Sequence, residues 1–337
     1  MTQIASNLVP TKLASVERIN ETDYLEVFTF KPQRPIPFKP GQYVNLVMEK
    51  PGLIDLVKNV QDVEGKKGEP AYDDEIKRIE KQKALIERNG YVQRQYSIFS
   101  PPNELDSDGK IVTYNDGNIK LYIIRVDRDG IGKNGRGLVT TELFKREEER
   151  EDINFYFNEK AKGLFLLPEH SGNANDTRDR VIVATGTGIA PYLSMLEDPT
   201  TIKEGINYVL FHGVSTQTDH AFKERISKLV LTMNLIYVPV ASRGTEIVVP
   251  QRYTEQFFMN EGRTRNPGER VKEEEIMEAI AKGKIHDTPL EGILGHELSP
   301  ENTLVMACGN PGMRHSLEII TTELGFGRKD FLKEDFW

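Results

Sequence analysis

The feature that most constrains the fold is the segment 181–192, Val-Ile-Val-Ala-Thr-Gly-Thr-Gly-Ile-Ala-Pro-Tyr. Four apolar residues typical of a buried strand run into a glycine-rich turn, and a helix-like run with Pro191 in its first turn follows. Such a turn lets backbone N–H groups and the positive end of a helix approach a pyrophosphate closely. The spacing is not that of the full Gly-x-Gly-x-x-Gly pattern, so the segment alone is weak evidence for a dinucleotide site.

The pattern of a buried strand followed by a helix is repeated in the rest of the chain. Compact apolar runs separated by helical stretches indicate further buried strands at 207–211, 235–240 and 303–307. Strands that alternate with helices predict a parallel α/β sheet.

The first half of the chain has a different pattern. From residue 12 to about 167 it consists of short β-like runs broken by Pro, Gly and Asp, which predicts an antiparallel barrel or sandwich. The clearest of these runs are 25–30, 43–47, 119–126 and 154–157. The segment 49–91 breaks this rhythm, and its charge-rich part is read as a helical insertion with a solvated surface rather than a catalytic role.

Length and the change of pattern together predict two domains. A chain of 337 residues exceeds one average domain. The polar, turn-forming stretch 171–179 separates the two patterns. We therefore predict an antiparallel β-barrel domain at 1–172 with a helical insertion near 49–91, and an α/β parallel-sheet domain at 173–337.

Composition excludes several classes of function. The formal net charge of −8 argues against non-specific binding to nucleic acid, which requires a cationic surface. No apolar run approaches the roughly 20 residues that span a bilayer, and the N-terminus does not have the pattern of a signal peptide. Cys308 is the only cysteine and the six histidines lack metal-ligand spacing, so we expect a cytoplasmic protein without a metal site and without a membrane or nucleic-acid partner.

One motif of the first domain has the groups that bind a flavin nucleotide. In the run Arg94-Gln-Tyr96-Ser97, strand alternation puts Arg94 and Tyr96 on one face. An arginine can bind a phosphate, an aromatic ring can stack on a flat heterocycle, and a serine hydroxyl can bind a ring nitrogen. The alternative, an ordinary strand with a packed Tyr96, is slightly favoured when the motif is considered alone.

Two more motifs lie in the second half. The run Met306-Ala-Cys308-Gly309-Asn-Pro-Gly-Met313 ends a strand in a glycine-rich turn, at the sheet edge where α/β folds bind ligands. The alternative for Cys308 is a buried small hydrophobe. The chain ends in Phe336 and Trp337, two aromatics that either pack on a core or cover a planar cofactor.

The order of these motifs resembles that of the ferredoxin–NADP reductase family. Its members carry an Arg-x-Tyr-Ser motif for FAD, a Gly-Thr-Gly-Ile-Ala-Pro turn, a Cys-Gly-x-Pro-Gly-Met segment and a C-terminal aromatic residue. All four occur here in this order across nearly the whole chain, and the Glu-Asp-Phe-Trp ending is most similar to the bacterial branch.

The resemblance implies an FAD site in the first domain. Arg94 would contact the FAD pyrophosphate, Tyr96 would pack against one face of the isoalloxazine, and Ser97 would bind near flavin N5. A glycine-to-threonine turn with Thr140 and Thr141 would hold the FAD phosphate.

The resemblance also implies a set of groups around the reacting rings. Phe336 would cover the other flavin face and move aside for nicotinamide, and Trp337 would lie beside the FAD adenine. Cys308 and Glu334 would lie near the nicotinamide. Together with Ser97 they would tune polarity and proton supply, and none would act as a nucleophile.

The NADP site implied by the resemblance lies in the second domain. Ser242 and Arg243 would bind the 2′-phosphate, although a turn with a solvated arginine is the alternative. Phe222 stands where many relatives have a tyrosine against the adenosine, and residues 212–215 lack an arginine common in the bacterial branch. The remaining expected contacts come from the two glycine-rich turns: Gly186, Thr187, Gly188, Pro191, Gly309 and Met313.

The resemblance implies an acidic electron carrier, ferredoxin or flavodoxin, and a monomeric enzyme. Because this chain is acidic as well, docking would need a local basic patch, for which the candidates are Arg125, Arg128, Lys133 and Arg136. Ordinary surface charge is an equally good interpretation of these four side chains.

Two alternatives remain open from the sequence. The chain could be the NAD(P)H-dependent reductase component of an oxygenase, which has the same two domains. It could also be an electron-transfer subunit that holds FAD without nicotinamide chemistry, although the Cys308 segment and the aromatic terminus count against this.

Overall fold

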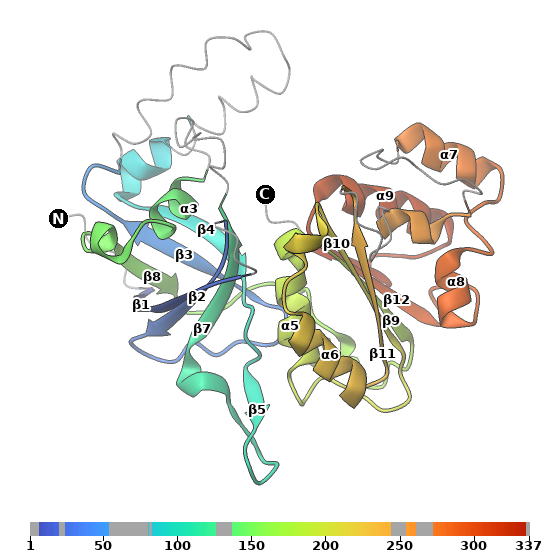
Figure 1. The fold of residues 1–337 in the computed structure, drawn as a ribbon, viewed down its shortest axis with the longest axis horizontal. Coiled ribbons are helices and arrows are strands. Elements are labelled where there is room, and N and C mark those ends of the chain that lie inside the picture. Colours follow the sequence, from blue (N-terminus) through green and yellow to red (C-terminus); the bar gives the residue numbers. More distant parts are fainter. Residues whose placement is uncertain are drawn as a thin grey trace. The chain divides into compact units, whose positions relative to one another are not determined.

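A computed structural model describes residues 7–19, 24–53, 80, 83–125, 137–243, 254–260 and 272–334. The chain divides into two compact units. The barrel unit is Met1–Pro102 with Thr113–Gly163, and the sheet unit is Asn103–Val112 with Leu164–Trp337. Each unit is described by itself (Figure 1). The domain limits at residues 172 and 173 remain a prediction.

The barrel unit is built on a six-stranded antiparallel sheet, as the sequence predicted. A bridge between Ile98 and Leu121 joins the two edge strands, so the sheet closes on itself. Inward-facing Phe28, Phe30 and Phe157 form part of its core. In sheet order the strands are β4 (Val92–Ser97), β3 (Tyr43–Glu49), β8 (Asn154–Asn158), β1 (Leu8–Arg18), β2 (Leu25–Pro32) and β7 (Ile119–Ile124).

Short helices complete the barrel unit. They are η2 (Tyr114–Gly117), α3 (Leu138–Leu143) and η4 (Glu147–Arg150). In the predicted insertion, residues 83–89 are helical, and most of the rest of 49–91 lies outside the described residues.

The sheet unit is the predicted parallel α/β fold. Its strands, in sheet order, are β11 (Leu235–Ala241), β10 (Tyr208–Val214), β9 (Asp179–Thr185), β12 (Thr303–Cys308) and β13 (Phe331–Glu334). All four neighbouring pairs are parallel. The order of connection reverses between β9 and β12, and open α/β sheets bind ligands at the carboxyl end of such a switch point.

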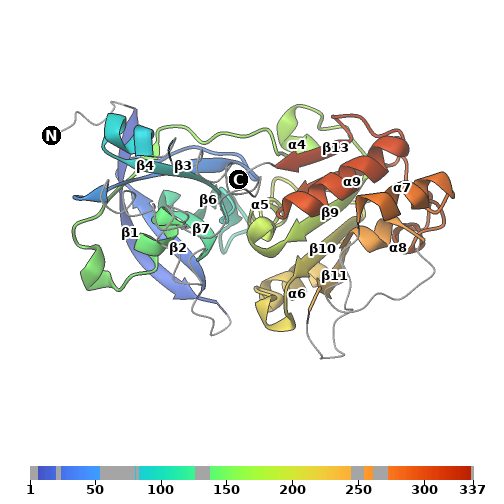
Figure 2. The same cartoon turned by 90° about the horizontal axis from the view of Figure 1, so that it is seen from above.

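Helices cover both faces of this sheet. In Figure 1, α5 and α6 lie on one face, while α7, α8 and α9 lie on the other. Figure 2 shows the same two layers from above. The helices of the unit are α4 (Pro168–Ser171), η5 (Gly186–Ile189), α5 (Ala190–Leu196), η6 (Gln217–Asp219), α6 (Lys223–Thr232), η7 (Thr254–Phe258), α7 (Glu273–Ala281), α8 (Pro289–Leu294) and α9 (Pro311–Glu323).

Two elements were not foreseen from the sequence. A hairpin of β5 (Asn103–Leu105) and β6 (Ile111–Thr113) interrupts the barrel sequence, and Asn103 binds the Asp198 carboxylate through both its backbone and its side chain. The short strand β13 adds a fifth parallel strand at the edge of the sheet. Among the described residues, no helix combines the length and apolar character needed to cross a membrane.

Candidate functional site

The two glycine-rich turns of the sheet unit interlock at the switch point. They follow β9 and β12, which are hydrogen-bonded neighbours. A Cβ at Gly188 would lie 2.4 Å from the carbonyl oxygen of Cys308, and a Cβ at Gly309 would lie 2.5 Å from the carbonyl oxygen of Thr185. Gly309 also has φ 121°. Both positions therefore require glycine, because each turn leaves no room for a side chain on the other.

Asn310 stabilises the second turn through hydrogen bonds of both its backbone and its side chain. Its backbone N–H donates to the Thr185 hydroxyl at 2.6 Å. Its side-chain oxygen accepts from the N–H of Gly312 at 2.8 Å and that of Met313 at 3.3 Å, which caps α9. The side chain of Met313 is buried in the core of the unit.

The first turn leaves backbone groups at the sheet edge. Gly186 is exposed and has φ 54°, Thr187 is half-buried, and Gly188 is buried. Pro191 lies at the start of α5, where its missing N–H costs no helical hydrogen bond. A glycine turn followed by a helix is the arrangement that lets backbone N–H groups bind a phosphate, so the turn stays a candidate for this role.

Strand β13 brings Glu334 beside Cys308. The two residues are register partners, and Cys308 Sγ lies 3.8 Å from Glu334 Oε2. Both side chains are buried. Burial and then the nearby Glu334 carboxylate raise the pKa of the Cys308 thiol well above its ordinary value, so this cysteine stays protonated.

Two further buried groups adjoin this pair, and the sequence analysis did not select them. Arg314 on α9 donates from Nε to the carbonyl oxygen of Gly309 at 3.1 Å. Burial lowers the pKa of Arg314, while the neighbouring Cys308 and Glu334 favour its charged form. The hydroxyl of Tyr192 donates to the carbonyl of Val183 at 3.2 Å.

Backbone hydrogen bonds join the ends of β10 and β11 at Ser242 and Arg243, the two residues predicted to bind a phosphate. The N–H of Ser242 donates to the carbonyl of Val214 at 2.9 Å, and that of Arg243 to Ser215 at 2.8 Å. Ser242 is half-buried and the side chain of Arg243 is exposed.

Phe222 at the start of α6 has a strained backbone. Its φ of 62° is rare for a residue with a side chain. The Arg225 guanidinium lies 5.3 Å from the Phe222 ring centroid and donates from Nε to Glu197 at 2.7 Å. Arg225 thus supports the ring and is held by a carboxylate, whereas Lys223 is exposed.

In the barrel unit, strand β4 positions the flavin motif. Arg94 is opposite Leu46 and Tyr96 is opposite Val44, so both share a face of the sheet with core residues. Both side chains are half-buried. Burial lowers the pKa of the Arg94 guanidinium, which makes an anion beside it favourable.

Helix α3 adjoins β4 and carries both predicted threonines. It begins after Gly137, whose φ of 68° is left-handed. The Thr140 hydroxyl donates to the Gly137 carbonyl at 2.8 Å. The Thr141 hydroxyl is buried and has no hydrogen-bond partner among the described residues. A buried hydroxyl without a partner is costly, so this position fits a ligand oxygen.

The sequence analysis also did not select a cluster of charged side chains around Glu142 of α3. Glu142 has a side chain only 2% exposed and binds Lys50 at 2.6 Å and Lys145 at 2.7 Å. Its two cationic partners allow this carboxylate to be buried. A Glu followed three residues later by Lys145 was the only signal in the sequence, and Lys50 is distant along the chain.

Several predicted residues lie outside the described part of the chain. They include the two terminal aromatics and three members of the basic patch: Phe336, Trp337, Arg128, Lys133 and Arg136. The remaining member, Arg125, is half-buried at the end of β7. Ser97 is half-buried at the end of β4, opposite Tyr43.

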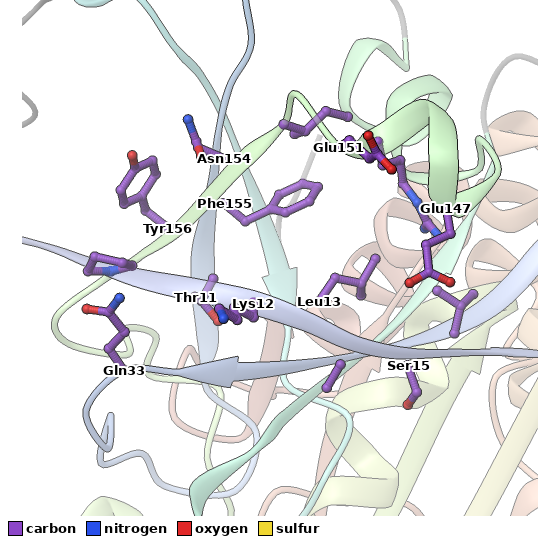
Figure 3. Close-up of a pocket in the computed structure, with 15 residues that line it drawn as sticks. Thr11, Lys12, Leu13, Ser15, Gln33, Glu147, Glu151, Asn154, Phe155 and Tyr156 are labelled. Atoms are coloured by element: carbon purple, nitrogen blue, oxygen red, sulfur yellow. The ribbon is translucent and has the colours of Figure 1, made fainter.

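An open groove of about 630 Å³ lies elsewhere in the barrel unit (Figure 3). It is lined by β1, β8 and the segment around η4, and it includes Thr11, Glu147 and Tyr156. None of the residues predicted to bind FAD or NADP lines it.

Comparison with known sequences gives matches of moderate extent. Residues 182–262 match the family model described as the oxidoreductase NAD-binding domain. The ferredoxin–NADP reductase of Pseudomonas aeruginosa is 26% identical over 153 residues, which are 43% of this chain and 48% of that protein. The flavodoxin/ferredoxin–NADP reductase of Buchnera aphidicola is 23% identical over 222 residues, 66% of each chain. The chain thus spans about half the length of the first of these relatives.

Solved structures share the fold over almost the whole chain. A ferredoxin NADP⁺ reductase from Neisseria gonorrhoeae with bound FAD and NADP has a TM-score of 0.59 at 19% identity, covering 98% of this chain and 99% of that one. A structure described as the ferredoxin reductase in carbazole 1,9a-dioxygenase has a TM-score of 0.54 at 14% identity, covering 98% and 69%. These matches confirm the resemblance to ferredoxin–NADP reductases: residues 182–262 match the oxidoreductase NAD-binding domain, and the chain shares the fold of these solved structures.

Proposed function

We propose that this protein is an FAD-dependent oxidoreductase that transfers a hydride between NADPH and FAD and exchanges single electrons with ferredoxin or flavodoxin. The observation that carries the proposal is the convergence of two interlocked glycine turns on the Cys308–Glu334 pair, at the switch point of the parallel sheet.

The barrel unit has residues that fit FAD. The buried Thr141 hydroxyl and the first N–H groups of α3 would donate hydrogen bonds to an FAD phosphate, and the half-buried Arg94 would neutralise its charge. Tyr96 and Ser97 would contact the ring. Bound FAD would supply hydride acceptance and one-electron release, which no side chain provides.

The sheet unit has residues that fit NADP(H). Backbone N–H groups of Thr187 and Gly188 would bind the pyrophosphate, because the absence of a side chain at Gly186 leaves open space beside the turn. Ser242 and the exposed Arg243 would bind the 2′-phosphate. Phe222, backed by Arg225, would stack on the adenosine.

Cys308 and Glu334 would set the polarity next to the nicotinamide. The raised pKa keeps the Cys308 thiol protonated, so it is a weak hydrogen-bond donor and not a nucleophile. Glu334, buried beside it, would place negative charge next to the nicotinamide ring, which becomes positive when the hydride leaves. Phe336 would cover the flavin ring, and Trp337 would lie beside the FAD adenine.

A second candidate is the reductase component of an oxygenase. The fold shared with the ferredoxin reductase of carbazole 1,9a-dioxygenase supports it. The two candidates differ in the expected coenzyme and carrier. The first predicts NADPH with ferredoxin or flavodoxin, and the second is compatible with NADH and a dedicated iron–sulfur partner.

The test is ferricyanide reduction by the purified, FAD-loaded protein with NADPH and NADH side by side, followed by cytochrome c reduction through added ferredoxin or flavodoxin. We expect NADPH to be preferred, and Arg243→Gln to reduce that preference without changing the rate with NADH. Preference for NADH would favour the oxygenase-type reductase. A yellow protein inert to both coenzymes would leave an electron-transfer subunit.

A further inference from the structure

A buried histidine behind the first glycine turn is not used by the proposed chemistry. His212 lies on β10, whose seven residues are all buried, and its own exposed fraction is 1%. Its Nε2 is 3.3 Å from the carbonyl oxygen of Gly186, and its Nδ1 is 3.4 Å from the hydroxyl oxygen of Tyr237 on β11. The ring therefore connects the turn after β9 to β11, the edge strand of the sheet.

The chemistry of the partners fixes the direction of these hydrogen bonds. A carbonyl oxygen can only accept, so Nε2 of His212 must carry the hydrogen and donate to Gly186. A neutral ring then has a bare Nδ1, which accepts from the Tyr237 hydroxyl. Burial and then His220 lower the pKa of His212 to about 3, and burial raises the pKa of Tyr237, so both groups keep these roles near neutral pH.

A second contact holds the backbone of the histidine. His220 Nε2 is 3.1 Å from the carbonyl oxygen of His212, and the two rings meet edge-on at 5.3 Å. Gly213, the next residue, has no space for a side chain, since a Cβ would lie 3.0 Å from Thr254 and 3.2 Å from Thr185. His212 is thus fixed from β11, from the segment before α6 and from its own strand.

The carbonyl that His212 holds belongs to the peptide between Gly186 and Thr187. In a planar trans peptide the C=O and N–H point in opposite directions. Holding the Gly186 carbonyl towards the sheet interior therefore aims the Thr187 N–H the other way, out of the turn. Without this hydrogen bond the peptide at Gly186 could rotate, since glycine permits many backbone angles, and its carbonyl would then repel an anion at the turn.

We propose that His212, aligned by Tyr237, is a positioning residue that fixes the Gly186–Thr187 peptide so that its N–H is presented to the pyrophosphate of the coenzyme. The proposal rests on the proposed nucleotide site. It assigns a role to a residue that does not itself touch the coenzyme, and it predicts that this role concerns the pyrophosphate and not the adenosine end.

The test compares two ligands by calorimetry with the full-length, FAD-loaded protein. NADP⁺ contains the pyrophosphate, whereas adenosine 2′-monophosphate contains the 2′-phosphate and adenine but no pyrophosphate. We expect His212→Leu to weaken the binding of NADP⁺ by about tenfold, which is the scale of one lost hydrogen bond. The binding of adenosine 2′-monophosphate should weaken by less than about threefold. The matched variant His212→Gln keeps an N–H donor near the Nε2 position and should restore most of the NADP⁺ affinity.

Tyr237→Phe isolates the alignment of the ring. It removes the donor to Nδ1 but leaves the bond to Gly186 possible, so we expect weaker NADP⁺ binding by about threefold, between wild type and His212→Leu. Equal loss of both ligands in His212→Leu, or no loss of either, would overturn the inference. Failure of the wild-type protein to bind NADP⁺ would instead refute the proposed function on which the inference rests.

A measurement on the unmutated protein covers the case in which the variants do not fold. Nitrogen NMR of the histidine side chains should find His212 neutral and protonated on Nε2 down to about pH 5, given its low pKa. A charged ring at pH 6, or a hydrogen on Nδ1, would contradict the donation to Gly186.

Discussion

The barrel unit and the sheet unit bring their candidate site residues together by different means. In the sheet unit, two turns from adjacent parallel strands lock into each other, with Gly188 and Gly309 as the points of contact. In the barrel unit, one strand and one six-residue helix supply single side chains, namely Arg94 on β4 and Thr141 on α3. The first site is thus a property of the backbone, and the second depends on individual side chains.

This difference determines how each site should respond to mutation. Backbone sites tolerate no added volume, because the clash involves main-chain atoms that cannot move aside. Side-chain sites tolerate truncation, since the fold does not depend on the group that binds the ligand. We therefore expect large losses of stability in the sheet unit and selective losses of affinity in the barrel unit.

The largest expected effect is at the amino end of β9. Arg180 is fully buried, with Nη1 3.0 Å from Asp176 and Nη2 3.4 Å from Glu169. Arg180→Met would remove a fully buried cation from both carboxylates at once. Asp176 would keep Arg178 at 2.7 Å and Glu169 only Lys203 at 3.7 Å, so the sheet unit should lose about 3 kcal/mol of stability. Hydrogen exchange of the β9 amides would measure the loss within this unit.

The matched change in the barrel unit is Lys50→Met. Glu142 would keep Lys145 at 2.7 Å, so the expected cost is smaller, about 1–2 kcal/mol. If Arg180→Met and Lys50→Met lowered the free energy of unfolding equally, Lys145 would not compensate for the loss of Lys50.

The next effect separates two glycines of the same site. Gly309→Ala places a Cβ 2.2 Å from the Thr185 hydroxyl at a φ of 121°, and should cost about 2–5 kcal/mol. Gly186→Ala meets no atom within 4 Å and carries only the strain of φ 54°, so we expect about 1 kcal/mol. Urea unfolding of both variants checks the ranking, and an equal cost would mean that the turns do not interlock.

A pH effect of intermediate size follows from Asp176. Burial alone would raise its pKa, but the hydrogen bonds from Arg178 and the charge of Arg180 lower it from 3.8 to about 2. A carboxyl with a depressed folded-state pKa stabilises the fold above its unfolded pKa and loses this effect as pH falls. The sheet unit should therefore lose about 2 kcal/mol between pH 5 and pH 2 from this group. Unfolding measured across that range should be flatter in Asp176→Asn.

The smallest expected change in stability distinguishes the two threonines of α3. Thr140→Val removes the hydrogen bond to Gly137 and should destabilise the FAD-free protein by about 1 kcal/mol. Thr141→Val removes a hydroxyl with no partner among the described residues, so its FAD-free stability should be unchanged or higher. Only Thr141→Val should weaken the binding of FAD by about tenfold without lowering the stability of the FAD-free protein. Fluorescence titration of FAD checks this, and unchanged affinity would remove Thr141 from the site.

The proximity of the two turns in the sheet unit could be predicted from the sequence because their residues lie in two short motifs. Each motif is a strand followed by a turn, and parallel strands necessarily bring such turns to one edge. The family resemblance implied only that Cys308 and Glu334 both lie near the nicotinamide, and the register of β13 shows that the two residues are neighbours.

Other parts of the sites depend on contacts between segments far apart in the chain. Arg314 looks like any polar residue in the first turns of a helix, and His212 reads as one more residue of a buried strand. Their partners, Gly309 and Gly186, become neighbours only once the sheet order is known. In the same way, Lys50 and Glu142 are 92 residues apart, so no local pattern could connect them.

Hydride transfer is tested most directly by anaerobic mixing of the FAD-loaded protein with NADPH, followed through the visible absorbance of the flavin. We predict rapid bleaching with NADPH and slower bleaching with NADH. Glu334→Gln should lower the rate with NADPH by about tenfold or more, because it removes the carboxylate charge beside the nicotinamide. A flavin that stays oxidised with both coenzymes would contradict the proposed hydride transfer.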